Sequence, residues 1–73
     1  MIDPYENLAN AIVLQAVKDY RKALKTLQMN PMSRSANADK NTLERFFLSE
    51  WYKFLTRVDG EMLIEKIQKE VKG

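Results

Sequence analysis

The chain has 73 residues and a net charge of +2, and it contains neither cysteine nor histidine. This composition excludes disulfides, thiol nucleophiles, imidazole bases and a zinc site with its usual ligands. Apolar residues make up 45% of the chain and charged residues 30%, with only two glycines and two prolines. These proportions are typical of a folded, mainly helical protein, and the length suits one domain. We therefore expect a single helical domain over residues 1–73.

The first predicted helix covers about residues 4–29. Asp3 suits the position before a helix, and Pro4 suits its first residue. Asn30 and Pro31 end the segment, because the residue before a proline is driven out of the helical region. Apolar residues recur at helical spacing along one face, which predicts an amphipathic helix.

Three alanines occupy the centre of that apolar face, seven residues apart: Ala9, Ala16 and Ala23. A row of small side chains leaves room for large side chains opposite, which is ordinary core packing. The same spacing can instead form a close self-association seam built on a seven-residue repeat. The sequence leaves both interpretations open.

The polar face of the same segment is basic. Four residues fall within about 100° on a helical wheel, and Arg34 follows nearby in sequence; the four are Lys18, Arg21, Lys22 and Lys25. Such a stripe can contact the phosphates of a nucleic acid, or it can be a solvated face near a helix C terminus. These five residues are the candidate nucleic-acid-binding residues.

Residues 30–41, with the sequence NPMSRSANADKN, predict a loop because they are rich in proline, serine, asparagine and aspartate. Connections between helices usually have about 2–8 residues, so this one is long. It is either a solvated linker or a binding loop in which Arg34 takes part.

The second predicted helix covers about residues 40–58 and contains five of the seven aromatic residues in the stretch RFFLSEWYKFL. On a continuous helical wheel the centre of a wide apolar arc is formed by Phe47, Trp51 and Phe54, with Leu55 beside them. This arc predicts core packing against the alanine row. If Trp51 lies in the core, Trp51→Ala should cost about 3–5 kcal/mol.

Three further residues of this stretch lie outside the centre of the arc, namely Phe46, Leu48 and Tyr52. Exposed aromatic residues are commoner in interfaces than elsewhere on a surface, so these three are the candidate partner-binding residues. A break near Ser49 would instead give two shorter helices with different faces. The sequence does not decide between a continuous and a broken helix.

The third predicted helix covers about residues 60–72, after Asp59 and Gly60 interrupt the chain. Leu63, Ile67 and Val71 provide its apolar face and should close the core. The expected fold is therefore all-α, a compact bundle of three main helices.

Catalytic, phosphate-binding and metal-binding motifs are missing from the sequence, so we expect no enzyme, no cofactor and no metal. The longest apolar stretch, AIVLQAV, is far shorter than the ~20 residues that span a bilayer, so we expect no membrane contact. The first residues, MIDPYENL, are acidic and unlike a signal peptide, which predicts a cytoplasmic protein.

Two stretches, LANAIVLQAVKDYRKAL and ERFFLSEWYKFLTRVDGEMLIEKIQKE, resemble a group of small proteins encoded by phages and other mobile elements of Gram-positive bacteria. The resemblance covers most of the chain except residues 30–41. Members of the group carry no assigned activity, so it transfers no functional residues, but it implies a cytoplasmic accessory role with a protein target. We expect a non-enzymatic interaction protein whose partner is a second copy, as a homodimer, or a host protein. The alternative is a nucleic-acid-binding regulatory protein.

Overall fold

A computed structural model describes the backbone of residues 4–72 and the side chains of residues 9–72. It contains four helices: α1 (Pro4–Met29), α2 (Arg34–Phe47), α3 (Glu50–Leu55) and α4 (Gly60–Lys72). The all-α fold predicted from composition is confirmed, as are the bounds of the first and last predicted helices. Asp3, which we expected before the first helix, lies outside the described residues.

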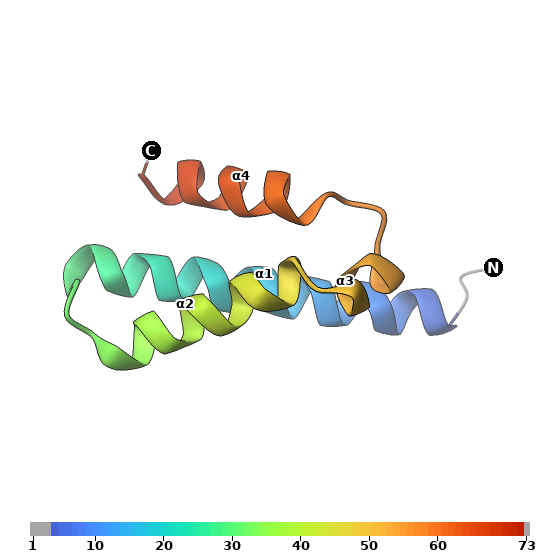
Figure 1. Ribbon diagram of the computed structural model, residues 1–73, viewed down its shortest axis with the longest axis horizontal. Helices are drawn as coiled ribbons and strands as arrows, with labels where there is room; N and C mark the ends of the chain where they lie inside the picture. The colour runs from blue at the N-terminus through green and yellow to red at the C-terminus, as the bar shows by residue number, and fades with distance from the viewer. Residues whose placement is uncertain (1–3, 73) are drawn as a thin grey trace.

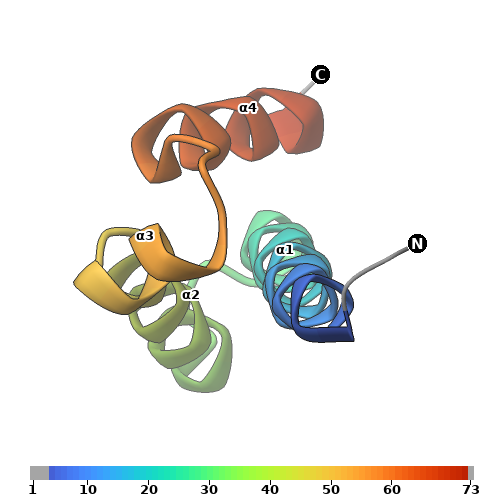
Figure 2. The ribbon, with the colours of Figure 1, turned by 90° about the vertical axis from the view of Figure 1, so that its right-hand side faces the viewer.

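Helices α1 and α2 form a hairpin, and α4 covers one side of it (Figure 1). α1 and α2 lie antiparallel, α3 turns the chain at the far end, and α4 returns over the pair in the same direction as α1. Seen along the hairpin, α4 lies above the seam between α1 and α2 (Figure 2). No helix of the described chain covers the opposite side of that seam.

The loop predicted over residues 30–41 is wrong, because α2 already begins at Arg34. Ser33 caps the helix: its Oγ accepts a 3.3 Å hydrogen bond from the amide of Ala36. Inside the first turn, Nδ2 of Asn37 donates to the carbonyl of Ser33 at 2.9 Å and to that of Pro31 at 3.3 Å. Polar side chains that favour loops in general therefore stabilise the start of a helix here.

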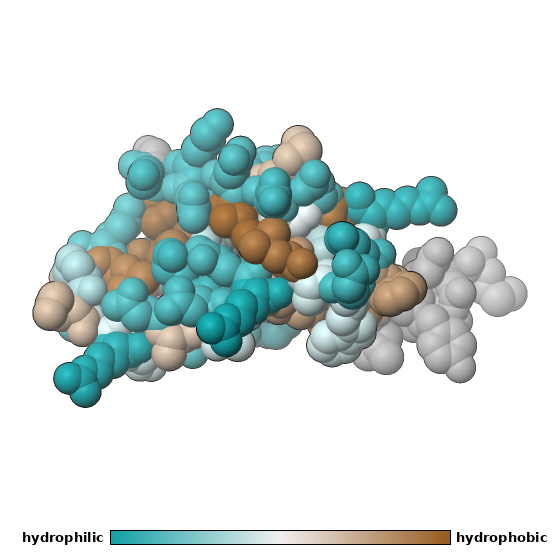
Figure 3. Space-filling model, viewed as in Figure 1, coloured by the Kyte–Doolittle hydropathy of each residue, from teal (hydrophilic) through white to brown (hydrophobic). Residues whose placement is uncertain are grey.

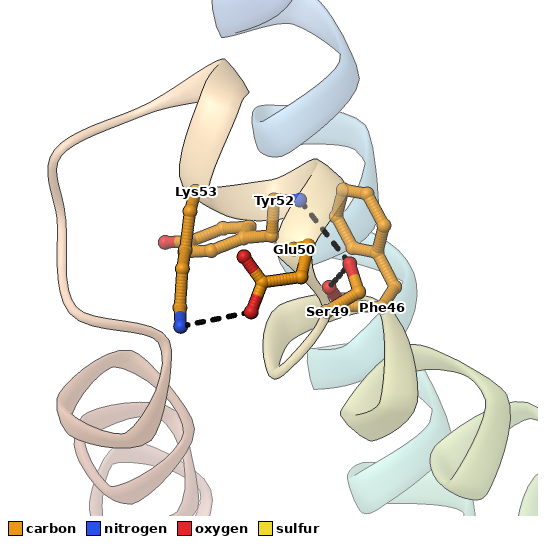
Figure 4. Close-up of polar contacts among 5 residues, drawn as sticks. All are labelled: Phe46, Ser49, Glu50, Tyr52 and Lys53. Atoms are coloured by element: carbon orange, nitrogen blue, oxygen red, sulfur yellow. Dashed lines mark hydrogen bonds and ion pairs between the residues drawn. The ribbon is translucent and has the colours of Figure 1, made fainter.

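The second predicted helix is broken at Ser49, the alternative that the sequence left open. α2 ends at Phe47, and Ser49 has an extended backbone with φ −80° and ψ 160°. Its hydroxyl donates to the carbonyl of Phe46 at 2.7 Å and accepts from the amide of Tyr52 at 3.1 Å (Figure 4). One side chain thus binds the last turn of α2 and caps the first turn of α3.

The core lies where α1, α2 and α4 meet, and α3 contributes one ring to it. Its fully buried side chains are small alanines beside large residues: Ala16, Ala23, Ala36, Tyr20, Phe47, Tyr52 and Ile67. Leu63 and Val71 of α4 are partly buried against this cluster, as predicted. Ala16 belongs to the same cluster as the large rings, so core packing accounts for the buried part of the alanine row.

The core position predicted for Phe47 is confirmed, since it is 1% exposed, but those of Trp51 and Phe54 are wrong. Trp51 is 58% exposed and Phe54 is 86% exposed, whereas Tyr52, expected at the edge of the arc, is 1% exposed. The reason is the break at Ser49: a wheel drawn for one continuous helix assigns the wrong face to the aromatic residues of α3. Leu55 is half-buried.

Gly60 allows the start of α4 to lie very close to the end of α2. A Cβ atom at this position would overlap the carbonyl of Phe47 and touch the ring of Tyr52. The absence of a side chain therefore allows the first turn of α4 to lie directly on the two buried aromatic residues.

Candidate interaction surface

A hydrogen-bond network centred on Tyr20 holds three helices in place. The Tyr20 hydroxyl donates to Oε2 of Glu44 on α2 at 2.6 Å, and Nε2 of Gln68 on α4 donates to that hydroxyl at 3.1 Å. Lys40 completes the network with an ion pair to Oε2 of Glu44 at 3.0 Å. These contacts set the spacing of α1 and α2, and with it the shape of the seam between them.

The pKa values of Tyr20 and Glu44 favour the protonation states in which their hydrogen bond forms. Burial, and next the hydrogen bond to Glu44, raise the pKa of Tyr20 to about 12. Burial by itself would raise the pKa of Glu44, but hydrogen bonds from Tyr20 and Lys40 lower it below its ordinary value. At neutral pH the phenol is therefore protonated and the carboxylate ionised, which is the state that keeps their hydrogen bond.

A row of aromatic rings leads from the core to the surface. Tyr20 packs edge-on against Phe47 with ring centroids 5.6 Å apart, and Phe46 lies 5.5 Å from Phe47. Phe46 in turn contacts Trp51 edge-on at 5.7 Å. The exposed indole is therefore supported by the core through a half-buried phenylalanine.

Trp51 borders a shallow hollow of about 460 Å³, here called the open groove. It lies between α1 and α2 and is closed at one end by α3, and six of its eight lining residues are apolar: Ala11, Ile12, Ala16, Leu43, Phe46 and Trp51, with Gln15 and Asp19 at the rim. Asp19 lies about 160° around α1 from Arg21, which contacts α4 through Glu70. The open groove is thus on the side of the hairpin that α4 does not cover.

The seam continues from the open groove toward the turn between α1 and α2 as a second hollow of about 530 Å³, here called the polar hollow. The two hollows share Asp19 and Leu43. Asp19, Lys22, Thr26 and Asp39 are among its lining residues. One continuous surface therefore changes from apolar to charged along the length of the hairpin.

The predicted partner-binding residues do not form one surface. Phe46 lines the open groove, but Leu48, 54% exposed, lines a different hollow beside the start of α4. The exposure predicted for Tyr52 is wrong, because its ring lies in the core. Sequence reasoning missed Trp51 as a surface residue, and Ser49, as a cap inside an apolar run, is the signal that could have indicated it.

The hydroxyl of Tyr52 is buried without a hydrogen-bond partner. Burial, and next the negative charge of Asp59, raise the pKa of Tyr52. Asp59 itself caps α4, since its Oδ1 accepts from the amides of Glu61 at 2.9 Å and Met62 at 3.3 Å. Figure 4 shows the Tyr52 hydroxyl pointing away from the Ser49 cap. The exposed side chains of Lys53 and Glu50, drawn in the same view, form an ion pair at 3.3 Å.

The basic stripe is partly confirmed as a surface. Lys18, Lys22 and Lys25 are exposed and share one side of α1 with Arg21 around a hollow of about 350 Å³. Arg21, however, is half-buried and pairs with Oε2 of Glu70 at 3.0 Å. Arg34 is exposed at the start of α2 but does not line this hollow.

A different face of the molecule is drawn in Figure 3. Hydrophobic residues show through a largely hydrophilic surface along the boundary between α4 and the helices below it. Hydrophilic side chains flank this band, which is consistent with the edge of the core between two layers rather than a separate flat patch.

Within residues 4–72, no helix is long and apolar enough to cross a membrane. Among the side chains described, those of residues 9–72, no group of three acidic residues comes together that could hold a metal ion. Comparison with protein-family models, with curated proteins and with solved structures finds no match for this protein.

Proposed function

We propose that this chain is a non-enzymatic interaction protein that binds another protein through the open groove. The observation that carries the proposal is the position of Trp51, the only tryptophan, which lies 58% exposed at the groove and packs edge-on against Phe46. Tryptophan is the residue most enriched among those that dominate binding energy in protein interfaces, together with tyrosine and arginine. The indole of Trp51 is packed on one side against Phe46 and exposed on the other, beside an apolar groove. It is therefore placed to contact a binding partner.

The shape of the groove suits a helix as its ligand. Two roughly antiparallel helices, α1 and α2, form its walls, and the apolar floor is bordered by the polar groups of Gln15 and Asp19. An amphipathic helix binds in such a groove by inserting apolar side chains spaced three or four residues apart. Polar groups at the rim then fix its direction.

The size of the exposed surface supports the proposal. A chain of 8.6 kDa folded to an average shape exposes about 4,700 Å². This chain exposes 5897 Å² and measures 44 × 23 × 18 Å. A standard interface covers about 800 Å² of each partner, so an elongated surface of this size can accommodate one partner.

The sequence resemblance suggests the kind of biological role in which this binding would occur. It implies an accessory role like that of small phage and mobile-element proteins, and the partner we propose is then either a second copy or a host protein. This role stays an expectation from the quoted stretches, because the resemblance transfers no functional residues.

Photo-crosslinking in the native host tests the proposed function. Benzoylphenylalanine in place of Trp51 should form covalent adducts with a bound protein under irradiation. The same amino acid in place of Phe54, which is 86% exposed but outside the groove, serves as the matched control. Adducts at position 51 and few at position 54 would support the proposal; no adduct at 51, or equal amounts at both, would contradict it.

A second candidate function is nucleic-acid binding, favoured by the exposure of Lys18, Lys22 and Lys25 on one side of α1. Positive charges spaced along a helix can neutralise successive phosphates. A gel shift at low salt with random duplex DNA tests this function, using Lys→Gln changes at all three positions. The matched control carries Lys→Gln changes at Lys66, Lys69 and Lys72, which are exposed on α4. Retardation lost only in the α1 variant would support the function, and no retardation of the unmodified protein would remove it.

A further inference from the structure

We infer that the occupant of the open groove is a second copy of the same chain, packed antiparallel so that the α1–α2 turn of each copy covers the groove of the other. The inference rests on the proposed function and names its partner. Three observations carry it: two exposed methionines on the turn, their position along the hairpin, and the charges between the turn and the groove.

Two of the most exposed apolar side chains in the described chain lie where α1 and α2 meet: Met29 is the last residue of α1, and Met32 lies in the turn. Met29 is 91% exposed and Met32 is 85% exposed. Methionine is flexible and apolar, and it fits irregular apolar surfaces well. The apolar groove, with Ile12 and Trp51, lies at the opposite end of the same hairpin. Each molecule therefore has both the open groove and exposed apolar side chains that can occupy the open groove of a second copy.

The two features also lie on the same side of α1. Met29 follows Ala11 by eighteen residues, which is five full turns of an α-helix, about 27 Å along its axis. A residue that lines the groove and a residue of the turn therefore face the same direction. A second copy lying across that face can contact both at once.

A two-fold axis across the middle of the hairpin brings the open groove of one copy to the α1–α2 turn of the other. The midpoint between Ile12 and Met29 falls between Tyr20 and Arg21, so α1 packs antiparallel against α1 of the second copy about that point. Such an interface is isologous, because every contact occurs twice. It closes after two copies and does not extend into a filament.

The charges near the midpoint are complementary under this symmetry. Asp19 and Lys22 both line the polar hollow, one on each side of the midpoint. In the antiparallel arrangement Asp19 faces Lys22 of the second copy, and the reciprocal pair forms at the same time. Opposite charges at these positions favour this register over one in which like charges meet.

Cysteine crosslinking tests the arrangement, because the natural chain contains no cysteine. Gln15 and Thr26 are exposed and lie at equal distances on either side of the midpoint. They are about 16 Å apart within one copy but opposite each other between copies. Mixing Gln15→Cys with Thr26→Cys under mild oxidation should therefore give a covalent dimer that contains one chain of each, and either variant by itself should give far less. A mixture of Glu61→Cys and Lys69→Cys, both exposed on α4, is the control and should stay uncrosslinked.

Sedimentation over a concentration range gives an independent measurement. The unmodified protein should form a dimer, and Met29→Gln with Met32→Gln, or Trp51→Ser, should weaken the association at least tenfold. Phe54→Ser removes an exposed aromatic residue outside the groove and should leave the association unchanged. Circular dichroism confirms that each variant keeps its helices.

The outcomes separate this inference from the proposed function. If the protein stays monomeric at all concentrations up to about 1 mM, which corresponds to very weak association, the inference is overturned. It is also overturned if a dimer forms but the mixed cysteine variants do not crosslink. If adducts at position 51 then contain another protein, the proposed function stands without the inference. If position 51 also gives no adduct, both fall.

Discussion

The hydroxyl of Tyr20 donates a 2.6 Å hydrogen bond to Oε2 of Glu44 and so joins α1 to α2 at the centre of the molecule. Tyr20 is fully buried, and Gln68 of α4 donates to the same hydroxyl at 3.1 Å. A small all-helical core consists mostly of apolar contacts that have no direction. This network adds directional contacts among three helices, and it fixes the seam on which the open groove lies.

The two buried tyrosines should respond oppositely to loss of their hydroxyls. Tyr20→Phe removes a hydrogen bond to a charged group and should cost about 1.5–3 kcal/mol. Tyr52→Phe removes a buried hydroxyl that has no partner, so it should be neutral or stabilising by up to ~1 kcal/mol. Urea denaturation of the two variants measures the difference, and equal losses of stability would contradict the assignment of their contacts.

The aromatic residues of RFFLSEWYKFL should separate into one buried class and one exposed class. Phe47→Ala should cost about 3–5 kcal/mol, because the ring is 1% exposed and its removal leaves a cavity. Trp51→Ala should cost about 1 kcal/mol or less in the monomer, since most of the indole is already in water. Thermal unfolding at low protein concentration compares them, with Phe54→Ala as the exposed control; a large loss for Trp51→Ala would place the indole in the core after all.

Ser49→Ala tests the break between α2 and α3. The change removes both the hydrogen bond to the carbonyl of Phe46 and the cap on the amide of Tyr52, and it should cost about 1 kcal/mol. Ser35→Ala is the matched control, because Ser35 is exposed inside α2. The control should change stability by less than ~0.5 kcal/mol. Similar effects in chemical denaturation would mean that the cap does not hold the break.

The raised pKa of Tyr20 predicts a loss of stability at alkaline pH. The pKa of this phenol is about 12 in the folded chain against an ordinary value of 10.0. The stabilisation is therefore complete below pH 10 and is lost as the pH rises to about 12, and its size is roughly 2–3 kcal/mol. The pKa of Tyr52 is raised as well, so it contributes in the same direction.

Urea midpoints between pH 8 and pH 12 measure this loss. The unmodified protein should lose stability more steeply than Tyr20→Phe, because the variant has no phenol at this position. All other side chains are the same in the two proteins, so their contributions cancel in the comparison. Parallel curves for the two proteins would contradict the predicted contribution of Tyr20.

Local sequence features correctly predicted the outer helices. Pro4 at the start of α1 and the Asn30–Pro31 pair at its end act through the backbone of their immediate neighbours, so no tertiary contact is needed to read them. The start of α2 was predicted too late, because Ser33, Asn37 and Asp39 are all residue types that favour caps and turns. The folded chain decided which of them begins the helix: Ser33 accepts from the amide of Ala36, and Asn37 donates to the carbonyls of Pro31 and Ser33.

The sequence by itself determined the helical class, the absence of thiol and imidazole chemistry, and the amphipathic pattern of the outer helices. These properties follow from composition and from periodicity within single helices. The tertiary structure decided which aromatic residue is buried, because the Ser49 cap changes the faces of the residues of α3, so that Tyr52 lies in the core and Trp51 at the surface. It also decided that α4 covers only one side of the α1–α2 seam, which leaves the open groove on the other.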